Sequence, residues 1–204
     1  MTLLKISDIR ARANQEPAIR LFKRTATMVL NDLAESKKEA FEEEEKGRNS
    51  YNIFLSHNSD AELVLGAKLT LEDYGYSVYV NWNEEHMDLT KESAATLRIC
   101  MECSKILLFL TTESKIDWVP WECAYMDGRK GRTGILPLSD TERDSFMGAG
   151  FLGLYPYIMS SQDSEGLFLH ETQKTFCTLT AWLNGLKPTM GNKDQVRSVS
   201  RDRN

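Results

Sequence analysis

A glutamate and the tryptophan four residues before it form the pattern in this sequence that could do chemistry. Trp118 and Glu122 would share one face of a helix, because residues four apart are neighbours on a helix surface. A flat aromatic ring can stack on a base. An ionised carboxylate can hold ribose hydroxyls and stabilise the positive charge that builds up on a sugar as its base departs. The pair fits a ribosyl site, although most glutamates in the first turns of a helix only serve the helix dipole.

Other familiar kinds of site are disfavoured by their motifs. The sequence has no G-x-G-x-x-G, no G-x-x-x-x-G-K-[ST] and no G-x-S-x-G. The histidines at 57, 86 and 170 lack the spacing of metal ligands. The C-x-x-C of Cys100 and Cys103 offers too few ligands for zinc, and we expect both to be small buried residues on one helix face. We therefore expect neither a metal nor a bound cofactor.

Short apolar runs alternate with helical patterns from Tyr51 onward, which is typical of βαβ units and predicts an α/β fold. The predicted strands are 51–56, 76–80, 105–111, 133–138 and 155–160. The predicted helices cover 91–103, 118–129 and 167–186, and a further one begins at Ser59 with capping-box spacing and stops at Gly75. We predict a flavodoxin-like, doubly wound sheet of five parallel strands with a helical N-terminal extension.

The two ends of the chain differ from this central part. Residues 1–48 carry apolar residues at helical spacing, namely Ile19, Phe22, Ala26, Val29 and Leu33. This amphipathic helix could pack on its own domain or serve self-association, and the sequence leaves both open. We predict a domain over residues 49–187 and a disordered tail over 188–204, where the chain turns polar.

Ligands of open parallel sheets bind beyond the carboxyl ends of the strands, which selects the candidate site residues. Ser56 and His57 follow the first strand, Trp82 follows the second, and Trp118 and Glu122 follow the third. Each has a structural alternative. Ser56 and His57 could cap the strand and hydrogen-bond the loop, and Trp82 could close the core.

Composition excludes several classes of partner. The chain is 41% hydrophobic and 27% charged with a net charge of −5, so it lacks the basic surplus that holds nucleic acid. No apolar run reaches the length of a membrane span, and Arg10 and Arg12 interrupt any signal peptide. We expect a cytoplasmic protein that binds neither nucleic acid nor membrane.

Two segments resemble the TIR (Toll/interleukin-1 receptor) domain family. Tyr51–His57 (YNIFLSH) resembles the first TIR box, with Asn52 in place of the usual Asp, and Trp118–Glu122 (WVPWE) resembles the helix that carries W-x-x-x-E. The resemblance spans residues 50–186. It implies that Glu122 is essential for cleaving NAD and that Trp118 stacks on the nucleotide. Residues 75–82, 118–128 and 135–137 particularly resemble prokaryotic TIR proteins, some of which serve in antiphage systems of the Thoeris kind.

The resemblance implies an enzyme that takes NAD+ as substrate and releases nicotinamide with ADP-ribose or a cyclic isomer. A cyclic product would act as a signal for a separate effector. TIR enzymes commonly need self-association to complete the pocket. Two alternatives remain open: a non-catalytic TIR interaction module, and an enzyme similar to nucleoside deoxyribosyltransferases, which would process free nucleosides.

Overall fold

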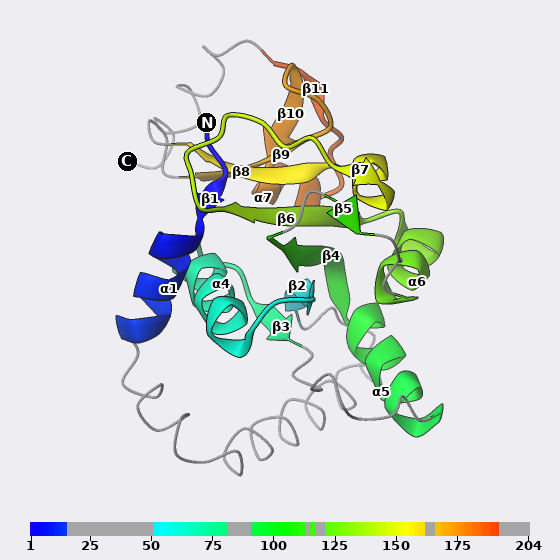
Figure 1. Ribbon diagram of the computed structural model, residues 1–204. Helices are drawn as coiled ribbons and strands as arrows, with labels where there is room; N and C mark the ends of the chain where they lie inside the picture. The colour runs from blue at the N-terminus through cyan, green and yellow to red at the C-terminus, as the bar shows by residue number, and fades with distance from the viewer. Residues whose placement is uncertain (16–50, 81–90, 113–114, 117–120, 162–165, 192–204) are drawn as a thin grey trace.

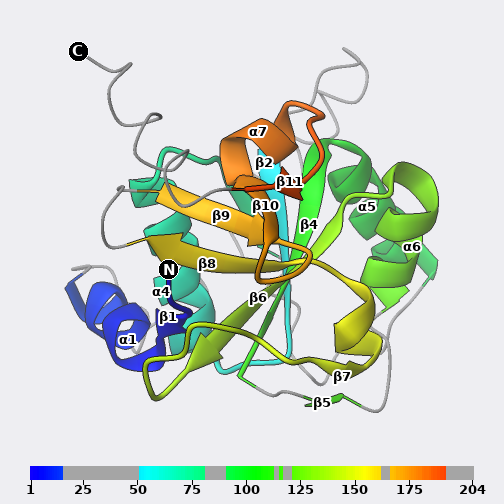
Figure 2. The same cartoon turned by 90° about the horizontal axis from the view of Figure 1, so that it is seen from above.

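The computed structural model describes residues 1–15, 51–80, 91–112, 115–116, 121–161 and 166–191. A twisted sheet runs through the middle of the molecule with helices on both of its faces (Figure 1; Figure 2 shows it from above). Five parallel strands lie side by side in the order β3-β2-β4-β6-β8. Their bounds are Val78–Val80 for β3, Tyr51–His57 for β2, Ser104–Thr111 for β4, Thr133–Ser139 for β6 and Tyr157–Ser161 for β8.

The prediction of an α/β fold is confirmed, but the prediction of a flavodoxin-like sheet with only five parallel strands is wrong. Among the described residues the main sheet has nine strands, and it continues beyond β8 in the antiparallel direction. The added strands are β9 (Gly166–His170), β10 (Thr175–Thr178) and β11 (Thr189–Met190). The ninth, β1 (Leu4–Lys5), pairs with the end of β6.

The predicted helix over 167–186 is therefore wrong for most of its length. Its apolar run, Leu167–Leu169, is short, and a run of that length fits a buried strand as well as a buried helix. A turn closes the β9–β10 hairpin, where the backbone N–H of Glu171 donates to the Thr175 carbonyl at 3.0 Å. Only α7 (Leu179–Leu183) is helical, and the Thr178 hydroxyl caps it by accepting from the backbone N–H of Ala181.

Alternation along the strands builds two cores, one on each face of the sheet. Ile53 and Leu55 of β2 point to the face covered by α1 (Ile6–Gln15), α4 (Ala61–Asp73) and α7. Phe54 points to the opposite face, which is covered by α5 (Lys91–Glu102), α6 (Trp121–Lys130) and the 3-10 turn η1 (Phe151–Leu154). Strands buried on both faces read as continuous apolar runs, which is why the sequence reveals them.

The helix α4 begins one residue later than predicted. Its N-cap is Asp60, whose carboxylate accepts from the backbone N–H of Leu63 at 3.0 Å, so Ser59 does not form the predicted capping box. The predicted stop is confirmed, because Gly75 follows the helix with a φ of 87°.

The first fifteen residues belong to the same fold. β1 extends the sheet, and α1 packs on α4 so closely that a Cβ on Gly66 would lie 2.1 Å from the Ile9 carbonyl oxygen. The predicted amphipathic helix with Ile19 and Leu33 lies outside the described residues, as do residues 192–204. The predicted tail begins too early at 188, because Thr189–Met190 form strand β11. The rest of the tail and the predicted domain bounds remain predictions. In the part of the chain that is described, no helix is long and apolar enough to cross a membrane.

Candidate functional site

Glu122 is the second residue of α6, at the carboxyl edge of the sheet. The direction of α6 follows from its other end, where Lys130 donates to the carbonyl oxygen of Ser104, the first residue of β4, at 2.7 Å. The helix thus runs from the carboxyl edge back to the amino edge. Glu122 therefore lies at the edge of the sheet where ligands of parallel sheets bind, as predicted from the order of the elements.

Glu122 is half-buried. Burial raises its pKa above the ordinary value of 4.5, and a hydrogen bond from its own backbone N–H partly offsets that rise. A carboxylate with little water around it interacts more strongly with a nearby positive charge, because less solvent screens the field. This suits a group that stabilises developing positive charge.

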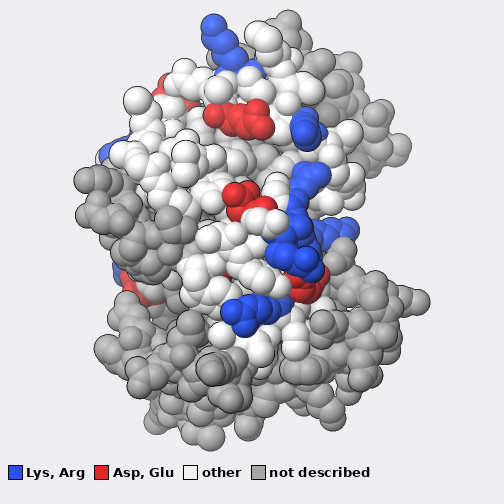
Figure 3. Space-filling view, turned by 90° about the vertical axis from the view of Figure 1, so that its right-hand side faces the viewer, with Lys and Arg blue, Asp and Glu red and all other residues white. Residues whose placement is uncertain are grey.

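Trp121 lies next to Glu122 but faces the seam between α5 and α6. The Arg98 guanidinium lies 5.6 Å from the centre of the Trp121 ring, and the ring of Tyr125 meets that of Trp121 edge-on at 6.3 Å. Trp121 therefore packs between the two helices. Figure 3 shows the side of the molecule on which α5 and α6 lie, with basic side chains gathered in a band beside smaller acidic patches.

Ser56 and His57 end strand β2, opposite Phe109 and Leu110 of β4. Ser56 is buried and alternates with Phe54, so its side chain points to the face that carries α6 and Glu122. His57 is half-buried and follows the opposite alternation. The structure therefore brings Ser56 and Glu122 to the same side of the sheet and separates His57 from them.

Trp118 and Trp82 lie outside the described residues, so their roles remain predictions. The prediction that Cys100 and Cys103 are buried is confirmed, although Cys103 follows the end of α5, and neither forms a disulfide. No cluster of three or more histidine, cysteine or acidic residues that could hold a metal ion occurs among the described residues.

Two residues in the loop between β2 and α4, Asn58 and Ser59, were not among the predicted site residues. The side-chain oxygens Asn58 Oδ1 and Ser59 Oγ are buried without a hydrogen-bond partner. Buried polar atoms are nearly always hydrogen-bonded in folded proteins, so an unpaired couple at the carboxyl edge of a sheet points to a ligand. Their place directly after the first strand was the signal in the sequence that could have identified them.

A pocket of about 540 Å³ opens elsewhere on the molecule, and its lining includes none of the predicted site residues. Thr2 and the segment Glu142–Met147 line it. That segment leads to strand β7 (Ala149–Gly150), which pairs with β5 (Lys115–Ile116) ahead of α6. The small β5–β7 sheet ties the residues that follow β6 to the residues that precede α6.

Comparison with known proteins gives the family. No protein-family model matches the chain. A curated protein of Bacillus cereus (strain MSX-D12), named a probable 3′ cyclic ADP-D-ribose synthase, ThsB′, is 39% identical over 145 residues, which cover 65% of this chain and 75% of the relative. The chain belongs to the ThsB′ family. Because no family model matches, the presence of a TIR domain in this member of the ThsB′ family remains a prediction.

Proposed function

We propose that this chain cleaves the bond between nicotinamide and ribose in NAD+ and that Glu122 is the catalytic carboxylate. The observation that carries the proposal is the identity of 39% to a relative named as a cyclic ADP-D-ribose synthase. Two features of the fold support it: Glu122 lies at the carboxyl edge of the sheet, and burial raises the pKa of its carboxyl group.

Cleavage of the nicotinamide–ribose bond requires the protein mainly to position the substrate and to stabilise the positive charge that develops on the ribose. As the glycosidic C–N bond breaks, its electron pair leaves with nicotinamide and neutralises the positive pyridinium nitrogen. The positive charge passes to the ribose ring, where it is shared between the anomeric carbon and the ring oxygen. The Glu122 carboxylate stabilises that charge, and it does so more strongly in a poorly solvated place.

Capture of the ribosyl group decides the product. Attack by water gives ADP-ribose, whereas attack by a hydroxyl of the same nucleotide closes a ring and releases the proton of that hydroxyl. The name of the relative, a 3′ cyclic ADP-D-ribose synthase, favours ring closure through a 3′ oxygen. We therefore expect the cyclic isomer as the main product, with ADP-ribose as the minor one.

The test is to incubate the full chain with NAD+ over a range of protein concentrations and to identify the products by chromatography and mass. The cyclic product is lighter than ADP-ribose by one water. Glu122→Gln should lower turnover by at least about 10²-fold, which is typical of removing one group that stabilises transition-state charge. The matched control is Glu72→Gln on α4, which loses only an ion pair with Lys68 and should keep its activity.

Each other outcome contradicts part of the proposal. Full activity of Glu122→Gln would remove Glu122 from the chemistry. Turnover of free nucleosides but not of NAD+ would favour a deoxyribosyltransferase-like enzyme. Absence of turnover at every concentration would favour a non-catalytic interaction module.

The proposal extends to a role in antiphage defence through the product. A cyclic nucleotide made by a cytoplasmic enzyme serves as a signal when a second protein responds to it, and self-association of this chain is the expected means of switching the enzyme on. In cells challenged with phage, protection should disappear with Glu122→Gln and persist with Glu72→Gln. Protection by Glu122→Gln would separate the defence role from NAD+ cleavage.

A further inference from the structure

We propose that Arg10 of helix α1 is a positioning residue for the loop Asn58–Asp60, and that this loop presents Asn58 and Ser59 to the ribose hydroxyls of the substrate. The inference rests on the proposed function for the identity of the substrate. The part that concerns Arg10 and the loop does not depend on the substrate, because it is based on contacts between described residues.

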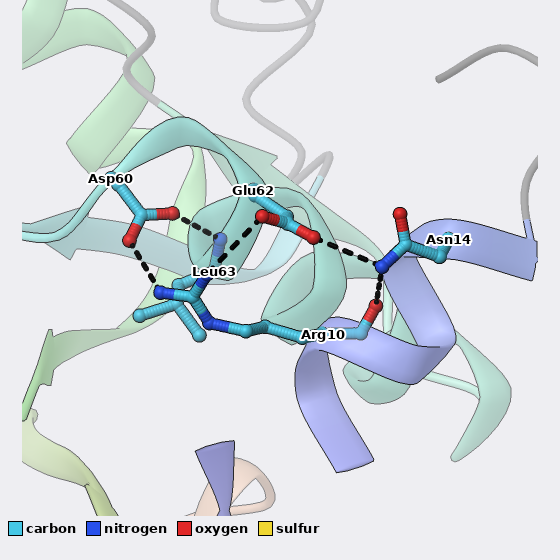
Figure 4. Close-up of polar contacts among 5 residues, drawn as sticks. All are labelled: Arg10, Asn14, Asp60, Glu62 and Leu63. Atoms are coloured by element: carbon cyan, nitrogen blue, oxygen red, sulfur yellow. Dashed lines mark hydrogen bonds and ion pairs between the residues drawn. The ribbon is translucent and has the colours of Figure 1, made fainter. Parts of the chain in front are cut away.

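Arg10 spans two carboxylates in the first turn of α4 (Figure 4). Its Nη2 lies 3.1 Å from Asp60 Oδ2, and its Nη1 lies 3.3 Å from Glu62 Oε2. Asn14, one turn further along α1, donates from Nδ2 to the other Glu62 oxygen at 3.0 Å and to the Arg10 carbonyl at 2.9 Å. The start of α4 is thus held by two residues of α1.

Asp60 is the link between this contact and the loop. One of its oxygens caps α4 by accepting from the Leu63 N–H, and the other accepts from Arg10. The residue that fixes where the helix begins is therefore itself fixed by α1. Asn58 and Ser59 come directly before it, so a shift of the cap would move both side chains.

The atoms that the loop presents have the chemistry that a sugar needs. Asn58 Oδ1 can only accept a hydrogen bond, whereas Ser59 Oγ can both accept and donate. Both are buried and unpaired. A ribose diol offers O–H donors and oxygen acceptors at short spacing, so it can satisfy both atoms. Leaving them unpaired costs free energy, which a bound sugar would recover.

The molecule provides a matched control on the same helix. Arg12 lies two positions after Arg10, about 200° around α1, and so leaves the helix on the opposite side. It makes a bidentate ion pair with Asp73, the last residue of α4. The Arg12 Nε donates to Asp73 Oδ2 at 2.6 Å and Nη2 donates to Oδ1 at 3.0 Å. Arg10→Ala thus removes the ion pairs with Asp60 and Glu62 at the start of α4, and Arg12→Ala removes the ion pair with Asp73 at its end, so only the first touches the end that carries the loop.

The first measurement is steady-state NAD+ cleavage by the full chain. Arg10→Ala should raise KM about five-fold, which is the size expected for losing one exposed ion-pair network. It should leave kcat within about two-fold, because the ribose contacts form in both the ground state and the transition state. Asn58→Ala should raise KM at least as much. Arg10→Lys should recover part of the loss, since one ammonium cannot span both carboxylates as a guanidinium does. Arg12→Ala should match the wild type.

The second measurement is amide hydrogen exchange over residues 57–64, which does not depend on turnover. Arg10→Ala should speed exchange there and Arg12→Ala should not. Equal exchange in the two variants, or faster exchange without a change in KM, would overturn the inference. If the wild type does not cleave NAD+, the proposed function fails and the ribose assignment with it, while the exchange comparison still decides whether Arg10 positions the loop.

Discussion

The two faces of the sheet differ in where their helices are held together. On the face of α1 and α4, the helices touch through Gly66 and are joined at both ends of α4 by Arg10 and Arg12. On the face of α5 and α6, the Lys130 ammonium at the amino edge donates to the carbonyl oxygens of Met101 and Glu102 at the end of α5. The carboxyl edge of that face carries Glu122 instead.

The two faces also differ in the electrostatic environment of a carboxylate, Asp73 on one face and Glu122 on the other. The Arg12 guanidinium hydrogen-bonds Asp73 and holds the pKa of that carboxyl group below its ordinary 3.8, so its charge stabilises the fold. Burial raises the pKa of Glu122, so its charge works against the fold. A carboxylate kept in a poorly solvated place at a cost in stability is more typical of a functional site than of a scaffold.

The largest expected effect on stability is at the helix crossing on the α1–α4 face. Gly66→Ala would place a Cβ 2.1 Å from a backbone oxygen of α1, which has little freedom to move. We expect a loss of about 3 kcal/mol in the free energy of unfolding, at the upper end for overpacking. Chemical denaturation of the variant measures it.

The control for that substitution lies on the other face. Gly128 of α6 has no atom within 4 Å of its Cβ position, so Gly128→Ala should stabilise the protein by about 0.5 kcal/mol through helix propensity. Similar losses for both variants would mean that α1 does not pack on α4 as closely as described.

The sequence predicted the parts of the molecule that depend on local pattern. The apolar runs at β2, β4 and β6 are buried on both faces, so their residue types alone identify them. The order of elements then placed Glu122 at the carboxyl edge. The strand β1 has only two residues and no local pattern, and its identity as a strand depends on pairing with β6.

What remained hidden from the sequence depends on contacts between distant residues. Arg10 and Asp60 are 50 positions apart, and nothing near either residue predicts that they meet. The β9–β10 hairpin was missed because its apolar run fits both helix and strand, and only the neighbouring strand β8 decides between them. The unpaired oxygens of Asn58 and Ser59 likewise become visible only once their surroundings are placed.

The next largest effect concerns the joint between α5 and α6. The Lys130 ammonium donates to the carbonyl oxygens of Met101, Glu102 and Ser104 at 3.2, 2.6 and 2.7 Å. Lys130→Met keeps an unbranched apolar chain of nearly the same reach but leaves these acceptors without their donor, and we expect a loss of about 2 kcal/mol. Thermal or urea unfolding measures it. The neighbouring Arg129→Met, which loses an exposed pair with Glu102, should have a clearly smaller effect.

A smaller effect should separate the chemistry of Glu122 from its cost to the fold. Because the pKa of Glu122 is raised in the folded state, its favourable contribution is complete below the ordinary glutamate pKa of 4.5 and is lost as the pH rises through the folded value. Glu122→Gln does not titrate there. It should therefore unfold at a higher temperature than the wild type at about pH 7.5, with the difference closing towards about pH 4. A lower melting temperature of the variant at neutral pH would show that the Glu122 charge supports the fold.

The smallest effect should have the opposite sign and comes from the other face. The pKa of Asp73 is lowered by Arg12, so its contribution to stability is present above the ordinary aspartate pKa of 3.8 and is lost as the pH falls through the folded value. Asp73→Asn should be less stable than the wild type at neutral pH by under about 1 kcal/mol, because the pair is partly exposed and water screens it. The difference in stability between Asp73→Asn and the wild type should disappear in acid. The same is expected for Glu122→Gln, but there the variant is the more stable protein at neutral pH. If both variants shifted stability in the same direction at neutral pH, the contrast between a stabilising face and a chemical face would not hold for their carboxylates.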